Sequence, residues 1–354
     1  MGSINSLIRS NIRKLRPYSS ARDEYEGGEA VFLDANENPY FSPLNRYPDP
    51  RQRSLKNIIS EIRSVPWENI FLGNGSDEAI DILVRAFCEP GEDNIVSIDP
   101  TYGMYEVTAA INAVEYRKAP LGNDFSLNME ELKRRSDENT KIIFLCSPNN
   151  PTGNCFVYHE IKSIFDWFKG LVVIDEAYID FSGKPGFLGE INNIPSLVVL
   201  QTLSKGWGRA GIRLGMAFGN REIIDVMNKI KPPYNINSLT IEEAVNTLGK
   251  AGEVKKRMDE IISGREWLRN RLSEFTFTGK IYPSDANFLL VRVDDAGALY
   301  GFLRERNIIV RNRSGAAGCE NCLRITVGSE NENEQLIGAL RDYSKKKATK
   351  RNSK

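Results

Sequence analysis

The chain alternates between short, almost continuous apolar runs and longer amphipathic segments. The segments 77–89 and 158–170 have the spacing of helices. The apolar runs are rich in β-branched residues and are apolar at nearly every position, which is typical of strands buried on both faces of a parallel or mixed sheet. The alternation predicts an α/β fold. The predicted strands are 94–98, 141–146, 171–175, 196–201 and 214–219.

A second set of elements follows the segment KPPYNIN, residues 231–237, whose double proline interrupts regular structure. Helical sequence runs from about 238 to 275, and a final helix is expected from about 330. Between them lie the strand NFLLVRV, the helix GALYGFLRERN and the strand LRITVG. A chain of 354 residues is long enough for two domains. We therefore predict an N-terminal arm (1–46), a large domain (47–235) and a small C-terminal domain (236–354).

The composition excludes several classes of protein. Lysine plus arginine and aspartate plus glutamate number 47 each, so no net charge attracts nucleic acid or an anionic membrane. No apolar run is long enough to span a membrane, and no apolar signal core is visible. Five cysteines fit a reducing compartment, and we expect a cytoplasmic protein. The isolated CxxC of Cys319 and Cys322, with His159 as the only histidine, predicts no metal site.

Four stretches carry candidate chemistry. In GNGSDEAI (73–80), glycines precede a helix, and a helix N-terminus suits a phosphate. In SPNNPTGN (147–154), two prolines restrict a loop that follows a strand. DEAYIDF opens with Asp175 at the carboxyl end of a buried strand, where α/β sheets bind ligands. TLSKGWGRAGIRLG places Lys205 where a buried strand gives way to glycine-rich backbone.

The glycines after Lys205 spell the dinucleotide-binding pattern G-x-G-x-x-G, but that motif must open a helix that crosses to a parallel strand. Here the next strand-like run starts about three residues after Gly211, so a NAD-dependent dehydrogenase is excluded. The four stretches together supply the chemical groups that bind pyridoxal 5′-phosphate. Its aldehyde requires a lysine amine, its ring nitrogen a carboxylate, and its phosphate amides, hydroxyls and a cation such as Arg213. We therefore predict that Lys205 is a Schiff-base lysine.

A set of motifs occurs along the chain in this order: DANENPY, NRYPDP, GNGSDE, PTYGMY, SPNNPTG, DEAYIDF, TLSKGWGRAGIRLG and LRITVG. The set resembles the fold-type I aminotransferases and, within them, the histidinol-phosphate subgroup. The resemblance extends from about residue 17 to residue 328. The resemblance implies a large domain with a mostly parallel central sheet flanked by helices, a smaller α/β domain, and a homodimer with shared active sites. It implies reversible transamination of L-histidinol phosphate with 2-oxoglutarate, giving imidazole-acetol phosphate and L-glutamate, in histidine biosynthesis. Threonine-phosphate decarboxylase and an aromatic amino-acid aminotransferase of the same fold stay open as alternatives.

The resemblance also implies a role for each matching residue. Lys205 would bond to the cofactor aldehyde and Asp175 would pair with the ring nitrogen. Tyr178 and Asn150 would hydrogen-bond the ring hydroxyl, and Tyr102 would stack on the ring. The phosphate would be held by Gly75, Ser76, Asp77, Thr202, Ser204 and Arg213. Tyr47 would arrive from the other subunit to contact cofactor and substrate, and the remaining substrate positions would be Tyr18, Asn36, Arg311 and Arg324.

Two expectations about this site come from the chemistry itself. Histidinol phosphate carries a CH2-phosphate where an amino acid carries its carboxylate, whereas glutamate carries two carboxylates. Arginine can bind both anions, and Arg311 and Arg324 are the candidates. A lysine in a positively charged, partly desolvated pocket has a lowered pKa, so we expect the amine of Lys205 to be more nucleophilic than an ordinary lysine.

Overall fold

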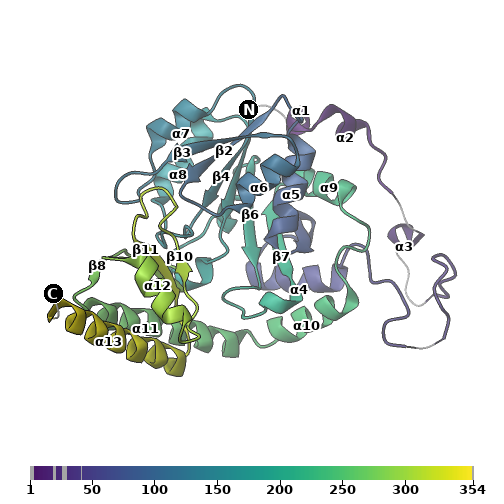
Figure 1. The fold of residues 1–354 in the computed structure, drawn as a ribbon. Helices are drawn as coiled ribbons and strands as arrows, with labels where there is room; N and C mark the ends of the chain where they lie inside the picture. Colours follow the sequence, from purple (N-terminus) through teal and green to yellow (C-terminus); the bar gives the residue numbers. More distant parts are fainter. Residues whose placement is uncertain (1–3, 19–20, 26–29, 41, 353–354) are drawn as a thin grey trace.

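The computed structural model describes residues 4–18, 21–25, 30–40 and 42–352. Within these ranges the chain builds two sheets, each covered by helices, and an N-terminal arm (Figure 1). The predicted α/β class is confirmed.

The larger sheet has the strand order β1-β7-β6-β5-β4-β2-β3. Only β7 runs against its neighbours β6 and β1, while the other pairs are parallel. The five predicted strands are all present, and the sheet is mixed as expected, whereas β1 and β3 were not predicted. The strands are β1 (Ile70–Asn74), β2 (Asn94–Asp99), β3 (Glu115–Pro120), β4 (Thr140–Cys146), β5 (Leu171–Asp175), β6 (Leu197–Thr202) and β7 (Leu214–Gly219).

Both faces of this sheet are buried, which explains why its strands are apolar at consecutive positions. Along β5, Val172 and Ile174 belong to one core cluster, and Leu171 and Val173 belong to the other. The first face is covered by α4 (Arg53–Arg63), α7 (Met129–Arg135), α8 (Tyr158–Trp167) and α10 (Ser238–Leu248). The opposite face is covered by α5 (Ser76–Phe87), α6 (Met104–Ile111) and α9 (Arg221–Ile230).

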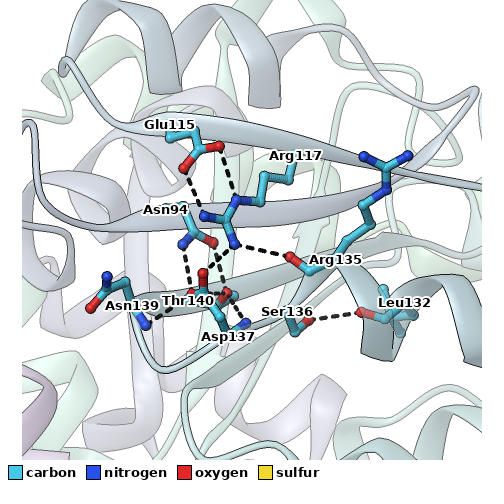
Figure 2. A network of polar contacts seen from close by, with 9 residues as sticks. All are labelled: Asn94, Glu115, Arg117, Leu132, Arg135, Ser136, Asp137, Asn139 and Thr140. Atoms are coloured by element: carbon cyan, nitrogen blue, oxygen red, sulfur yellow. Dashed lines mark hydrogen bonds and ion pairs between the residues drawn. The ribbon is translucent and has the colours of Figure 1, made fainter.

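A polar network closes the amino-terminal end of three strands in the larger sheet (Figure 2). Arg117 of β3 pairs with Glu115 and with Asp137, and its guanidinium lowers the pKa of Asp137 to about 2. Asn94 of β2 donates to Asp137 over 3.0 Å, and Thr140 of β4 donates to Asn94 over 2.7 Å. The network ties the starts of β2, β3 and β4 together, at the opposite end of these strands from their carboxyl ends.

The smaller sheet is antiparallel, with the order β10-β11-β9-β8. The predicted division of the chain at residue 235 stays a prediction. Just beyond that residue, α10 packs against α4, which covers one face of the larger sheet. Cys319 and Cys322 are free thiols buried beside Phe125 and Tyr282. The elements here are β8 (Thr278–Ile281), β9 (Phe288–Val293), β10 (Arg311–Asn312), β11 (Cys322–Thr326), α11 (Ala251–Ser273), α12 (Ala296–Arg304) and α13 (Glu330–Asn352).

The N-terminal arm contains α1 (Ile4–Leu7), α2 (Ser10–Lys14) and α3 (Ala21–Glu24). In Figure 1 the part around α3 lies apart from both sheets. Glu37 organises this part, because it accepts from Arg22 over 2.6 Å and from Arg46 over 2.7 Å. Large apolar side chains on it are exposed, including Val31 at 87 % and Leu33 at 86 %. Across the described part of the chain, we find no helix that combines the length and the apolar character needed to cross a membrane.

Candidate active site

One cavity opens at the carboxyl ends of the central strands, the edge at which α/β sheets bind ligands. The loops after β1, β4, β5 and β6 meet there, although they lie far apart in the sequence. Every position predicted to hold the cofactor from within one chain lies in its lining, together with Cys146 and Ala177. These positions are Gly75, Ser76, Asp77, Tyr102, Asn150, Asp175, Tyr178, Thr202, Ser204, Lys205 and Arg213.

The first wall of the cavity is the N-terminus of α5. Gly75 precedes the helix with φ +74°, a conformation that glycine adopts without strain. A β-carbon on Gly75 would lie 2.5 Å from Nη2 of Arg213, and one on Gly215 would lie 2.1 Å from the amide nitrogen of Ser76. The chain therefore needs glycine at both positions to bring a helix N-terminus and a guanidinium together, and these are the groups that bind a phosphate.

Two hydroxyls complete this wall. Thr202 ends β6, and its Oγ1 accepts from the amide of Ser204 over 3.1 Å and lies 2.9 Å from the Ser204 hydroxyl. Arg213 also forms an ion pair of 3.3 Å with Asp77, whose other carboxylate oxygen accepts from Tyr102 over 3.0 Å. An arriving anion would compete with Asp77 for Arg213, so the amide of Asp77 rather than its carboxylate is suited to contact a phosphate.

Lys205 stands in the turn between β6 and β7. The turn is short, since Leu203 donates to Leu214 over 3.1 Å and only the 3-10 helix η4 (Ala210–Ile212) intervenes. The absence of a crossover helix agrees with the rejection of a dinucleotide-binding motif. Gly206 is required because a β-carbon there would lie 2.6 Å from Oδ2 of Asp180. Trp207 is buried in the first core cluster, so it serves packing.

The amine of Lys205 is unusual in its electrostatics. Much of the side chain is exposed, yet burial among the cavity walls lowers the pKa of the amine, and the positive charge of Arg324 lowers it further. The direction and both causes confirm the expectation from the sequence. The Nζ atom lies 5.6 Å from the centre of the Tyr178 ring. Near neutral pH, more of this amine is uncharged than in an ordinary lysine.

Asp175 ends β5 and is 2 % exposed. It accepts from the hydroxyl of Tyr105 over 2.7 Å and from the amide of Ala177 over 3.0 Å, and burial raises its pKa. Tyr105, on α6, was not singled out from the sequence, although it lies three residues after Tyr102 and its ring packs edge-on against the Tyr102 ring, with centroids 5.7 Å apart. Its ring is stacked on Phe144 with a centroid distance of 4.8 Å, so its hydroxyl is fixed. Tyr105 therefore orients the carboxylate of Asp175.

Asn150 links the cavity to the smaller sheet. Its Nδ2 atom lies 3.5 Å from the hydroxyl of Tyr178, and its Oδ1 atom accepts from Nη1 of Arg324. Arg324 lies on β11, where it is the register partner of Arg311 on β10. One amide therefore has its donor side toward Tyr178 and its acceptor side toward Arg324.

Three predicted positions lie elsewhere in the chain. Tyr47 stacks on Tyr234, with ring centroids 4.5 Å apart. Tyr18 is 74 % exposed and lines a hollow that also contains Lys56, and Asn36 is exposed on the arm with φ +54°. All three are on the N-terminal side of α4 and do not line the cavity of Lys205. Within a single chain, the structure therefore does not bring them to this site.

The sequence pattern of the family described as "Aminotransferase class I and II" matches residues 24–340. The chain therefore belongs to the class I and II aminotransferases, as the motifs suggested. Enzymes of this family use pyridoxal 5′-phosphate.

More specific similarities point to one member of the family. The chain is 54 % identical over 342 residues to the histidinol-phosphate aminotransferase of Parabacteroides distasonis, covering 97 % of this chain and 99 % of that protein. Its fold is similar to the crystal structure of the histidinol-phosphate aminotransferase from Clostridium acetobutylicum, with a TM-score of 0.79, 26 % identity and coverage of 86 % and 92 %. The enzyme from Sinorhizobium meliloti, solved in complex with pyridoxal 5′-phosphate, shares the fold with a TM-score of 0.77, 22 % identity and coverage of 85 % and 83 %.

The residues of the cavity fit this cofactor. The glycine-framed start of α5, together with Arg213, suits the phosphate, and the buried carboxylate of Asp175 suits a protonated ring nitrogen. Lys205 supplies an amine whose pKa is lowered. The three kinds of group that the cofactor needs therefore line one cavity.

Proposed function

We propose that this chain catalyses the reversible transamination of L-histidinol phosphate with 2-oxoglutarate, giving imidazole-acetol phosphate and L-glutamate, a step of histidine biosynthesis. The observation that carries the proposal is the sequence identity of 54 % over nearly the whole length of a histidinol-phosphate aminotransferase. The lining of the Lys205 cavity supports it. The free state of Cys88, Cys146, Cys155, Cys319 and Cys322 fits a cytoplasmic enzyme.

The bound cofactor supplies an aldehyde for exchange of the amino group and a ring that accepts the electrons released at the substrate carbon. The protein contributes placement and proton transfer. Asp175, held by Tyr105, would place a carboxylate where it can stabilise a protonated ring nitrogen. Lys205 would hold the cofactor and, once displaced by substrate, its Nζ would take the proton from the carbon that bears the nitrogen. The lowered pKa of that amine leaves it free to accept the proton.

Arg324 is proposed to bind the anionic end of both substrates. It is one of two arginines paired across β10 and β11, and its guanidinium is fixed by Asn150. Replacing it by methionine removes a charge-assisted hydrogen bond, which corresponds to about a 10- to 100-fold loss. We expect Arg324→Met to weaken the half-reactions with histidinol phosphate and with glutamate, measured separately by the spectral change of the cofactor. Unchanged kinetics with both substrates would refute this role.

We propose a homodimer with shared active sites, in which Tyr47 reaches the site of the other chain. The arm that precedes Tyr47 exposes Val31, Leu33 and Tyr40, each more than four-fifths accessible, and a second copy of the chain would cover them. Tyr47 itself lies outside the cavity of its own chain. Tyr18 and Asn36, on the same arm, are proposed to reach the substrate in the same way.

This arrangement predicts complementation between two inactive variants. In a mixture of Tyr47→Ala and Lys205→Ala, half of the dimers formed by random exchange are hybrids, and each hybrid has one site with both residues intact. We expect recovery of about a quarter of the wild-type activity after denaturation and refolding together. Activity of the mixture that equals the sum of the separate variants would show that Tyr47 does not act across an interface.

The direct test of the function is a product assay. Incubation with histidinol phosphate and 2-oxoglutarate should yield glutamate and the keto phosphate in equal amounts. The alternatives are distinguished in the same experiment, since a threonine-phosphate decarboxylase would release carbon dioxide from O-phosphothreonine. An aromatic aminotransferase would prefer phenylalanine or tyrosine to histidinol phosphate. Absence of the keto phosphate would reject the proposed substrate while leaving the family assignment intact.

A further inference from the structure

A third arginine joins Arg311 and Arg324 beside the active site. Arg313 directly follows β10, and its amide donates to the carbonyl of Cys322 over 2.8 Å, which continues the pairing with β11. Because side chains alternate along an extended strand, residues 311 and 313 share one face. The Nη2 atom of Arg313 lies 3.5 Å from Oδ1 of Asn150, the same oxygen that accepts from Arg324. Arg313 is therefore connected to the wall of the Lys205 cavity.

In the part of the chain that the structure describes, the three guanidinium groups lack a counter-charge. Among the described residues, no carboxylate forms an ion pair with any of them, and Asn150 offers only a neutral oxygen. The Nε atom of Arg313 is buried without a hydrogen-bond partner. Burial lowers the pKa of Arg313, and the neighbouring charges of Arg324 and Arg311 lower it further, which shows that the groups repel one another.

A cluster of this kind is built for an anion of more than one charge. Two arginines are sufficient for a carboxylate, which has two oxygens and one charge. A phosphate monoester has three terminal oxygens and a charge approaching −2 near pH 7, with its second pKa near 6. The unused donor of Arg313 and the absence of a carboxylate both fit the larger anion.

We infer that Arg313 is a specificity-determining residue that selects the phosphate monoester of the substrate over a carboxylate at the same site. The inference rests on the proposed function for the name of the phosphate substrate. Arg324 serves both substrates, whereas Arg313 adds a contact that only the phosphate can use. Loss of Arg313 should therefore separate the two half-reactions, and loss of Arg324 should not.

The test compares Arg313→Gln, Arg313→Lys and the exposed control Arg341→Gln on α13. For Arg313→Gln we expect the dissociation constant of histidinol phosphate to rise about 10- to 100-fold, the range of one charge-assisted hydrogen bond, with that of glutamate changed by less than about threefold. For Arg313→Lys, the dissociation constant of histidinol phosphate should lie between those of Arg313→Gln and wild type, because lysine keeps the positive charge but lacks the paired N–H donors of the guanidinium. Arg341→Gln should match wild type. Equal weakening of the binding of both substrates, or no weakening of either, would overturn the inference.

A second readout does not depend on turnover. Inorganic phosphate should compete with glutamate for the cofactor-loaded wild type at pH 8, and this competition should be weaker in Arg313→Gln. The difference should shrink as the pH is lowered to about 6, where inorganic phosphate is mainly a monoanion. If the wild type fails to convert histidinol phosphate, the proposed function is wrong, and this competition still decides the role of Arg313. Equal competition by phosphate in both proteins at pH 8 would count against it.

Discussion

Replacement of Lys205 by alanine is expected to lower turnover by at least about 10⁴-fold, the upper end of what a positioned proton-transfer group contributes. Lys205 carries two roles, since it would hold the cofactor covalently and would move the proton at the substrate carbon. Its lowered pKa, caused by burial and by Arg324, suits both roles. The protein should still fold, because the side chain is largely exposed at the cavity and belongs to no core cluster.

The measurement combines activity with the visible absorption of the protein. The wild type should show a band that shifts with glutamate and returns with 2-oxoglutarate, and Lys205→Ala should lack the band unless an amine is added. Lys184→Ala offers a matched control, since Lys184 pairs with Asp285 outside the cavity. A normal band in Lys205→Ala without added amine would mean that another residue holds the cofactor.

Replacement of Asp175 by asparagine should be the second most damaging change. Removing one partner of a buried charge pair costs about 3–5 kcal/mol, or roughly 10²- to 10⁴-fold in rate if the loss is felt in the transition state. The asparagine has nearly the same shape. Its Oδ1 can still accept from the amide of Ala177, and its Nδ2 can donate to the hydroxyl of Tyr105, so the cavity should keep its form. We expect the maximum rate to fall by this factor in both half-reactions.

Glu176, the next residue along the chain, provides the control. It is equally buried, accepts from Gln201 over 2.9 Å and from the amide of Phe187 over 2.6 Å, and does not line the cavity. Burial raises its pKa to about 7, so its carboxyl is already partly neutral near pH 7 and Glu176→Gln should have a small effect on the rate. A rate for Asp175→Asn within threefold of wild type would contradict the role given to Asp175.

The stability of the cofactor-free protein separates a catalytic effect from misfolding. Burial raises the pKa of Asp175 in the folded state. The stability that this group contributes is therefore fully present below the pKa that it has in the unfolded chain, and it is lost as the pH rises through the folded-state pKa. The side chain of Asp175→Asn is neutral at every pH, so the variant does not lose stability in this way as the pH rises. We therefore expect the thermal midpoint of the variant to be no lower than that of the wild type.

The sequence predicted those parts of the fold that are buried on both sides. β4, β5 and β6 are central strands, and their continuous apolar runs gave nearly the observed boundaries. β3 was missed because it is an edge strand with the polar sequence EYRKAP, which has no apolar run to recognise. β1 was missed because its apolar part is only three residues long before Gly73. These strands depend on their neighbours rather than on their own pattern.

The site shows the same division. Lys205 and Asn150 could be predicted because each lies in a loop whose glycines or prolines mark it, and Asp175 could be predicted because it is a carboxylate at the end of a buried apolar run. Tyr105 and Arg313 could not, since a tyrosine in a helix and an arginine in a polar loop are ordinary until the fold shows what they face. Tyr18, Asn36 and Tyr47 stay predictions, because a single chain does not bring them to the cavity.

The central claim is that the amine of Lys205, and no other, bonds to the cofactor aldehyde. Reduction of the purified yellow protein with sodium borohydride fixes that bond, and mass spectrometry of its peptides locates it. We predict a single phosphopyridoxyl group on the peptide that contains Lys205. Lys56 is the informative competitor, since burial lowers its pKa to about 7 and it lines a different hollow. The group on Lys56 or on any other lysine, with Lys205 unmodified, would contradict the account.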